Sequence, residues 1–273
     1  MADSAEFDAV IATWAPNRAA SWLHRTEMSW RHVLVAIVVL IAVGWAAIHF
    51  GLPWAARKVA FLLPTGLTTT LTDQTLATLD ATMLAPTRLT HARQNELQAK
   101  FRTFLDAVGD RTPYRIEFRV MKGDVPNAFA LPAGVIVITD ALVHLAEDDR
   151  EIVAVLAHEC GHIRHRHTLR AVLQNSAVFV VLALATGDVS SATALGSALP
   201  AFLLQSRFSR DFEREADAHA VAELRRGGLE PAHLARILGR LAATHSEGDS
   251  KVMGYLRTHP PTPERIESIQ GKR

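Results

Sequence analysis

The residues with the clearest chemical meaning are His158-Glu159-Cys160-Gly161-His162, which fit the pattern His-Glu-x-x-His. On a helix, residues four apart lie on one face, so the two imidazoles can reach the same metal ion. Glu159 follows the first histidine and is placed to contact a water molecule rather than the metal itself. The spacing therefore predicts a metal site with a general base beside it.

A catalytic zinc site needs three protein ligands and one open position for water. A histidine six residues after the pentad would be one source of the third ligand, but Thr168 stands there. A carboxylate on a later helix is the other source. In the acidic segment 210–219, Glu213 and Asp217 are four apart and share a helix face, whereas Glu215 points elsewhere. One of that pair is predicted to bind the metal while the other hydrogen-bonds a ligand histidine.

Hydrophobic periodicity indicates the elements that must position these residues. Asp148 and Glu151 form a capping-box-like start for the helix that carries the two histidines. Upstream, apolar residues recur at helical spacing over 90–108. Segments 114–120 and 134–139 are predicted as strands, the first because polar and apolar residues alternate in it. We therefore expect an α+β fold that is mostly helical and has a small β-sheet.

A hydrophobic run from Val33 to Ala56 contains one titratable side chain, His49. At 1.5 Å per residue this run spans about 36 Å, enough to cross a hydrocarbon core of about 30 Å. We expect residues 31–57 to form a single transmembrane anchor. A cleaved signal peptide is the rival interpretation, although no clear small-x-small cleavage site follows the run.

The rest of the chain divides by composition. Residues 1–30 are expected to be a tail, 58–87 a connector with a short helix, and 88–273 the catalytic domain. Within that domain, 171–204 carry only Asp188 as a charge, in two apolar pieces that are each too short to span a membrane. We expect an apolar helical hairpin there; two short or re-entrant spans are the alternative.

The composition excludes several classes of protein. Lys plus Arg number 29 and Asp plus Glu 28, so no basic field exists to attract nucleic acid. Cys160 is the only cysteine in the sequence, which excludes a disulfide scaffold and a thiolate-rich zinc cluster, and we expect it to pack as a small apolar residue. His165 and His167 lie among arginines, and we expect them to form a solvated or membrane-surface basic patch.

The two motifs together, His158-Glu-x-x-His162 and Glu213-x-x-Ala216-Asp217, resemble those of the membrane-associated gluzincin metallopeptidases that include HtpX, BepA and the CAAX prenyl proteases. Three further stretches are similar to this family: Asn127-Ala-Phe-Ala-Leu-Pro132, Ser209-Arg210, and Thr258-His259-Pro260 with Arg265-Ile266. The resemblance covers about residues 88–270. It implies a zincin-like domain in which one Zn²⁺ is bound by His158, His162 and Glu213, with Asp217 as a supporting partner and Glu159 as the general base.

The resemblance also implies roles for two other stretches. Asn127, Ala128, Phe129 and Ala130 would form an exposed edge strand that pairs with the backbone of a peptide substrate. Similarity to BepA-like members implies that His259 is a latch or fourth ligand that fills the open zinc position. The other interpretation of His259 is a helix-entry residue before Pro260.

We therefore expect a membrane-anchored zinc metalloendopeptidase. The resemblance implies that it acts in protein quality control at a bacterial envelope, with protein or peptide substrates, membrane lipid as a partner, and no nucleic acid. A single span argues against prenylated substrates, since a CAAX prenyl protease encloses its site within many spans. The alternative is a non-catalytic membrane chaperone or scaffold with a structural zinc, which would need no general base at Glu159.

Membrane orientation follows only from the flanking charges. Arg18, Arg25 and Arg31 precede the hydrophobic run, whereas Arg57 and Lys58 follow it. This difference favours a cytoplasmic amino terminus, and so a single-pass protein of the inner membrane with a periplasmic catalytic domain. The oligomeric state stays open.

Overall fold

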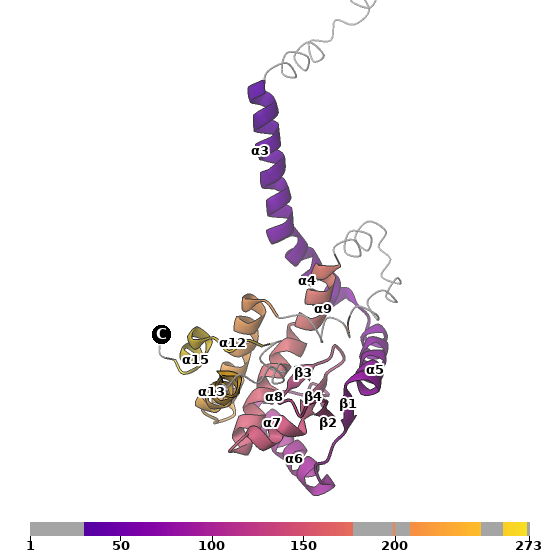
Figure 1. Cartoon of the computed structure of the whole chain (residues 1–273), viewed down its shortest axis with the longest axis vertical. Coiled ribbons are helices and arrows are strands. Elements are labelled where there is room, and N and C mark those ends of the chain that lie inside the picture. The colour runs from indigo at the N-terminus through magenta and orange to yellow at the C-terminus, as the bar shows by residue number, and fades with distance from the viewer. Residues whose placement is uncertain (1–29, 177–198, 200–207, 247–258, 272–273) are drawn as a thin grey trace, which may run out of the picture. The chain divides into compact units, whose positions relative to one another are not determined.

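The computed structural model describes residues 30–176, 199, 208–246 and 259–271, and the chain divides into two compact units, Met1–Pro53 and Trp54–Arg273. A helical stretch begins in the first unit with α3 (Trp30–Ala46) and a π-helical turn (Ala47–Gly51), and it continues as α4 (Leu52–Leu62) (Figure 1). This stretch, Trp30–Leu62, is long and apolar enough to cross a membrane, and its most apolar 18-residue window has a mean hydropathy of 2.6. It contains the whole of the expected anchor 31–57 and suggests a membrane-associated protein.

The second unit is built around a small four-stranded sheet. Its strands, in spatial order, are β1 (Leu84–Pro86), β2 (Arg115–Met121), β4 (Val135–Thr139) and β3 (Ala128–Ala130). The central pair β2 and β4 is parallel, whereas β1 and β3 are each antiparallel to their neighbour. β2 and β4 confirm the two strands predicted from sequence, and β3 forms one edge of the sheet.

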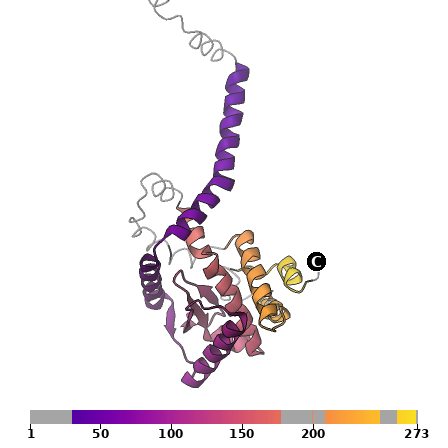
Figure 2. The same cartoon turned by 180° about the vertical axis from the view of Figure 1, so that it is seen from behind.

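Helices supply most of this unit, as expected for the predicted α+β fold. They are α5 (Thr65–Thr82), α6 (His91–Val108), α7 (Asp140–Leu145), α8 (Asp149–Arg164), α9 (His167–Asn175), α12 (Arg210–Arg226), α13 (Ala232–Ser246) and α15 (Pro263–Ile269). Ile116 and Phe118 of β2 share one apolar core with residues of α6, α8, α12 and α13. α8 and α12 lie side by side in both views (Figures 1 and 2).

Local side-chain chemistry sets the helix ends. The hydroxyl of Thr90 accepts a hydrogen bond from the N–H of Arg93 and caps α6. At the start of α8, Asp148 accepts from the N–H of Arg150, while Glu151 reaches back to the N–H of Glu147. The capping box expected at α8 is therefore present in a variant form, with Glu151 bonded one residue before the cap. This start fixes the register of the helix that carries the two histidines.

The segment 58–87 differs from its prediction as a connector with a short helix. α5 is a full-length helix, and β1 joins the sheet upstream of residue 88. Threonine is a weak helix former, which is why the sequence gives little signal here. Within α5, however, Thr75 donates to Leu71 O, and Thr72 accepts from the N–H of Ala133 at the sheet. These tertiary and local contacts offset the low intrinsic propensity.

The expected hairpin 171–204 lies mostly outside the described residues. Only its first residues, at the end of α9, and residue 199 are described. The prediction of an apolar hairpin that links α9 to α12 therefore stays a prediction.

Candidate metal centre

Four buried side chains point their donor atoms at one another: His158 and His162 of α8, Glu213 of α12, and His259 ahead of α15. These atoms all lie within 4.8 Å of one another. The Nε2 atoms of His158 and His162 are 3.0 Å apart, and His162 Nε2 is 3.4 Å from Glu213 Oε1. His259 Nδ1 is 2.9 Å from Glu213 Oε1 and 3.5 Å from His158 Nε2. Three imidazole nitrogens and a carboxylate oxygen so arranged can hold a divalent metal ion.

The two helices can approach this closely because small residues face each other between them. A Cβ atom built on Gly161 of α8 would lie 2.9 Å from the Cα and 3.0 Å from the carbonyl oxygen of Ala216 on α12. A larger residue at position 161 would push the helices apart. Glu213 lies one turn before Ala216, so the close contact brings its carboxylate within reach of the histidines on α8.

Glu159 is completely buried beside the cluster. Within the described residues neither of its carboxylate oxygens has a hydrogen bond of ordinary geometry. Burial raises the pKa of its carboxyl group above the usual value, and the charges of His259 and His158 offset this only in part. Ala130 and His259 are its polar neighbours, with His259 Nε2 3.7 Å from Glu159 Oε1. A buried carboxylate without an ordinary hydrogen bond is costly to the fold.

The outer nitrogen of His158 has an acidic partner. His158 Nδ1 lies 3.0 Å from Asp217 Oδ1, and Arg265 of α15 donates to both oxygens of Asp217, at 2.7 and 2.8 Å. Burial alone would raise the pKa of Asp217, but His158 and Arg265 outweigh it and the pKa lies below the usual value. Arg265 Nη1 also lies 2.7 Å from Glu213 Oε2, so one guanidinium holds both acidic side chains. In the sequence, Arg265 stands out only as part of a stretch that resembles the family, and no local pattern predicts its contacts with Asp217 and Glu213.

His259 belongs to this cluster by position. It is fully buried, and α15 begins only at Pro263 with Thr262 as its N-cap, so His259 does not enter a helix. Arg265 donates to the carbonyl of Pro260 at 3.0 Å and thereby ties the segment that carries His259 to α15.

The prediction that His165 and His167 form a solvated patch is wrong for His167. His167 is fully buried, with Nδ1 3.0 Å from His162 Nδ1 and Nε2 2.9 Å from Glu215 Oε2. His165 is partly exposed, and its Nδ1 lies 3.0 Å from Glu215 Oε1. Arg170 also donates to Glu215, at 2.8 Å. Glu215 points away from the metal donors, as its place on the helix predicts, and its carboxylate contacts His167 instead.

β3 is an edge strand as expected, but it is buried rather than exposed. The relative exposures are 5, 0, 5 and 2% for Asn127, Ala128, Phe129 and Ala130. Because Phe129 pairs with Val137 of β4 in a hydrogen-bonded position, the N–H and C=O groups of Ala128 and Ala130 face the outer edge. Thr168 of α9 donates to Ala130 O at 3.1 Å and covers part of that edge.

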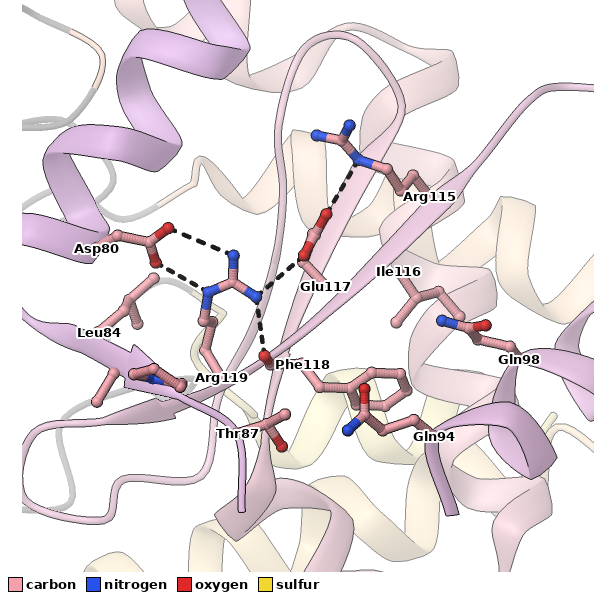
Figure 3. Close-up of a pocket in the computed structure, with 12 residues that line it drawn as sticks. Asp80, Leu84, Thr87, Gln94, Gln98, Arg115, Ile116, Glu117, Phe118 and Arg119 are labelled. Carbon is pink, nitrogen blue, oxygen red and sulfur yellow. Dashed lines mark hydrogen bonds and ion pairs between the residues drawn. The ribbon is translucent and has the colours of Figure 1, made fainter. Parts of the chain in front are cut away.

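Two other features lie apart from the cluster. Cys160 packs in the apolar core, where burial raises the pKa of its thiol well above the usual value, as its predicted apolar role requires. A cavity of about 650 Å³ lies between β1, β2, α5 and α6 (Figure 3). Arg119 donates there to Asp80 at 2.9 Å and to Glu117 at 3.0 Å, so these charges are paired within the protein. The cavity is not lined by any of the four metal-donor residues.

Comparison with known proteins shows similarity to a family of metallopeptidases, which agrees with the possible metal site. Residues 91–273 match the model of the family described as Peptidase family M48. The chain is similar to the metalloprotease LoiP of Escherichia coli (strain K12), with 30% identity over 220 residues that cover 78% of this chain and 83% of LoiP. It is also similar to the mitochondrial metalloendopeptidase OMA1 of Schizosaccharomyces pombe, with 27% identity over 60% of this chain and 48% of that protein. The beta-barrel assembly-enhancing protease of Yersinia pestis is 28% identical over 59% of this chain and 35% of its own length. The matched part thus spans less than half of the last two relatives.

Proposed function

The chain belongs to peptidase family M48, and from that premise we propose that it is a membrane-anchored, zinc-dependent metalloendopeptidase. The observation that carries the proposal is the convergence of His158, His162 and Glu213 beside the buried carboxylate of Glu159. The first three would bind the metal, and Glu159 would act as the general base.

The spacing of the donor atoms supports zinc. Zn–N bonds of about 2.0–2.1 Å in a tetrahedral site place neighbouring donors about 3.3–3.4 Å apart. Four of the six separations between the donors are 2.9, 3.0, 3.4 and 3.5 Å, and all six lie within 4.8 Å. The donor set of imidazole and carboxylate is also the one that catalytic zinc sites use.

Each residue near the metal has a separate task in peptide hydrolysis. When bound, zinc supplies a Lewis acid that polarises the scissile carbonyl and lowers the pKa of its water ligand to about 7. Glu159 takes a proton from the attacking water and passes it to the leaving amine, for which a carboxyl with a raised pKa is suited. Asp217, held by Arg265, fixes the ring of His158 so that Nε2 faces the metal.

His259 would act as a latch. Its Nδ1 atom occupies the fourth corner of the donor set, where a catalytic site keeps an open position for water. The described arrangement is then that of an idle enzyme, and displacement of His259 would open the site. The outer edge of β3, which is buried in the described arrangement, would bind the substrate backbone once the site has opened. Ala128 and the N–H of Ala130 face that edge, and Ala130 lies next to Glu159.

The relatives suggest where such an enzyme works. LoiP is a bacterial metalloprotease, and the Yersinia pestis relative is named for enhancing β-barrel assembly. We infer a role in protein quality control at a bacterial envelope, with the catalytic domain on the periplasmic side of the inner membrane. Misfolded or misassembled envelope proteins are the expected substrates.

One observation favours a second function. Four donors that close on one another are typical of a structural zinc site, which would suit a chaperone or scaffold. Such a site has no use for Glu159, whose burial without an ordinary hydrogen bond is destabilising. Activity of a Glu159 variant therefore decides between the two functions.

The deciding experiment measures cleavage of unfolded casein by the full chain, purified in detergent and loaded with zinc. Glu159→Gln should lower the rate by at least about 100-fold, because it removes the general base. Glu117→Gln, which changes a carboxylate in the separate cavity, is the matched control and should leave the rate unchanged. Equal rates in wild type and Glu159→Gln would refute the mechanism.

His259→Ala completes the test. It should raise the basal rate, because it empties the fourth position of the donor set. If wild type and a folded, zinc-loaded His259→Ala protein are both silent, the peptidase proposal fails and the scaffold remains.

A further inference from the structure

We propose that His167, held by Glu215, is a positioning residue of the metal site that fixes the ring of the ligand His162. The inference rests on the proposed ligation of the metal by His162. It gives a function to a buried histidine that the catalytic scheme does not use.

The orientation of the His162 ring is the first step. Its Nε2 atom faces the other donors, 3.0 Å from His158 Nε2 and 3.4 Å from Glu213 Oε1. Its Nδ1 atom therefore points outward, where it lies 3.0 Å from His167 Nδ1. The two rings are nearly perpendicular, with 77° between their planes and 4.9 Å between their centroids.

The protons of this pair follow from the metal. An imidazole that binds a metal through Nε2 carries its proton on Nδ1 and donates it to a neighbouring acceptor. His162 Nδ1–H would then donate to His167 Nδ1, which leaves the proton of His167 on Nε2. That proton points at Glu215 Oε2, 2.9 Å away. Each nitrogen of His162 and His167 is thus either a donor or an acceptor, and a single tautomer of His167 satisfies its contacts with both His162 and Glu215.

The packing around His167 holds its ring in this position. It stacks on Phe212 of α12, with 4.5 Å between the ring centroids and 8° between their planes. Glu215, at the other end, is held by Arg170 at 2.8 Å and faces His165 at 3.0 Å. A ring that is packed, bonded at both nitrogens and fully buried cannot rotate without breaking several contacts at once.

A strained turn delivers His167 to this place. Arg166 adopts a left-handed conformation, φ 52° and ψ 37°, between the end of α8 and the start of α9. A non-glycine residue in that region carries a conformational cost, so the surrounding contacts must maintain the turn. The turn brings the first residue of α9 back against the helix that carries His162.

The two histidine ligands consequently have unlike partners. His158 faces the carboxylate of Asp217, whereas His162 faces an imidazole and meets a carboxylate, that of Glu215, only one residue further out. A carboxylate partner raises the basicity of the ligand more than a neutral imidazole does. We therefore expect His167 to fix the position of the His162 ring and to have little effect on the basicity of that ring.

Two variants separate the two contacts of His167. In His167→Asn the amide oxygen can lie near the place of Nδ1 and accept from His162, whereas in His167→Gln the amide nitrogen can lie near the place of Nε2 and donate to Glu215. Zinc affinity of the detergent-purified full chain is measured by competition with a chromophoric chelator, and the visible spectrum is recorded after loading with Co²⁺. His233→Asn is the control. Like His167, His233 is buried and contacts a charged side chain, here Arg236, but it lies on α13.

We expect His167→Gln to weaken zinc binding about 10–100-fold and to shift the Co²⁺ spectrum. His167→Asn keeps the contact with His162 but loses the one with Glu215, so its loss should be several-fold and smaller than that of His167→Gln. His233→Asn should match wild type. Wild-type affinity and spectrum in a folded His167→Gln protein would overturn the inference while the proposed metal site stands. Equal losses in the Asn and Gln variants would also overturn it, since they would indicate a packing role only.

If His167→Gln does not fold, Glu215→Ala provides the second variant. It removes the acceptor of His167 Nε2–H and should weaken zinc binding several-fold with the same direction of spectral change. Unchanged binding in Glu215→Ala would overturn the inference. A wild-type protein that binds neither Zn²⁺ nor Co²⁺ would refute the proposed function itself, and the inference with it.

Discussion

Replacing Gly161 with alanine tests whether helix contact sets the metal geometry. The new Cβ atom would lie 2.9 Å from Ala216 Cα, about 0.5 Å closer than the 3.4 Å at which ordinary contact begins. Because the opposing atoms belong to the backbone, α12 as a whole must move to relieve the clash. Metal–ligand distances tolerate about ±0.2 Å, so a shift of this size carries Glu213 out of range. Overpacking of this kind costs about 1–3 kcal/mol.

Gly239→Ala is the matched control for this substitution. Gly239 lies inside α13, and a Cβ atom built on it meets nothing within 4 Å in the described structure. Alanine there should raise the free energy of unfolding by about 0.5–1 kcal/mol, because glycine is a poor helix former. The same chemical change is thus expected to act in opposite directions at the two sites.

The assay has two readouts on the full chain in detergent. Urea denaturation of the metal-free protein gives the free energy of unfolding, and chelator competition gives the zinc affinity. We expect Gly161→Ala to be less stable by about 1–3 kcal/mol and to bind zinc at least about tenfold more weakly. A Gly161→Ala protein with wild-type stability and affinity would show that the close approach of α8 and α12 does not determine the site.

Three further predictions concern pH, capping and the metal. The hydrogen bond from Arg93 holds the pKa of Asp149 at about 2, below its ordinary 3.8, so the pair stabilises the fold above about pH 4 and loses that effect as the pH falls towards 2. In urea denaturation, Asp149→Asn should be about 1–2 kcal/mol less stable than wild type at pH 7, and the difference should narrow below pH 4. Thr90→Ala should lower the free energy of unfolding by about 1 kcal/mol through loss of the α6 cap, whereas Thr103→Ala on the exposed face of α6 should change it little. Removal of the metal by a chelator should lower the melting temperature, and added zinc should restore it.

The sequence predicts those parts of the site that depend on the spacing of residues within one helix. His158 and His162 are four apart on one helix, and Glu213 and Asp217 repeat that spacing on another, so each pair can be recognised without a structure. That the pairs face each other depends on the contact between the helices at Gly161, which no periodicity encodes.

The remaining contacts cannot be predicted in this way because they join distant segments. Arg265 and Asp217 are 48 positions apart in the sequence, and so are His167 and Glu215. The surrounding arginines made His167 resemble a surface residue, yet Arg170, one of them, neutralises Glu215 in a partly buried position. β3 was recognisable as an edge strand, but its burial depends on helices far along the chain.

The side chain of Arg166 connects the turn after α8 to the end of α4. Its guanidinium donates to the carbonyls of Ala60 and Leu63, where α4 ends, and lies over the ring of Phe61. The backbone of the same residue forms the bend that seats His167 against His162. Arg166 therefore joins the end of α4 to the turn that positions His167. Arg57 of α4 also lies 3.9 Å from Glu215, the partner of His167. A displacement of the end of α4 would therefore disturb the support of His162 through both Arg166 and Glu215.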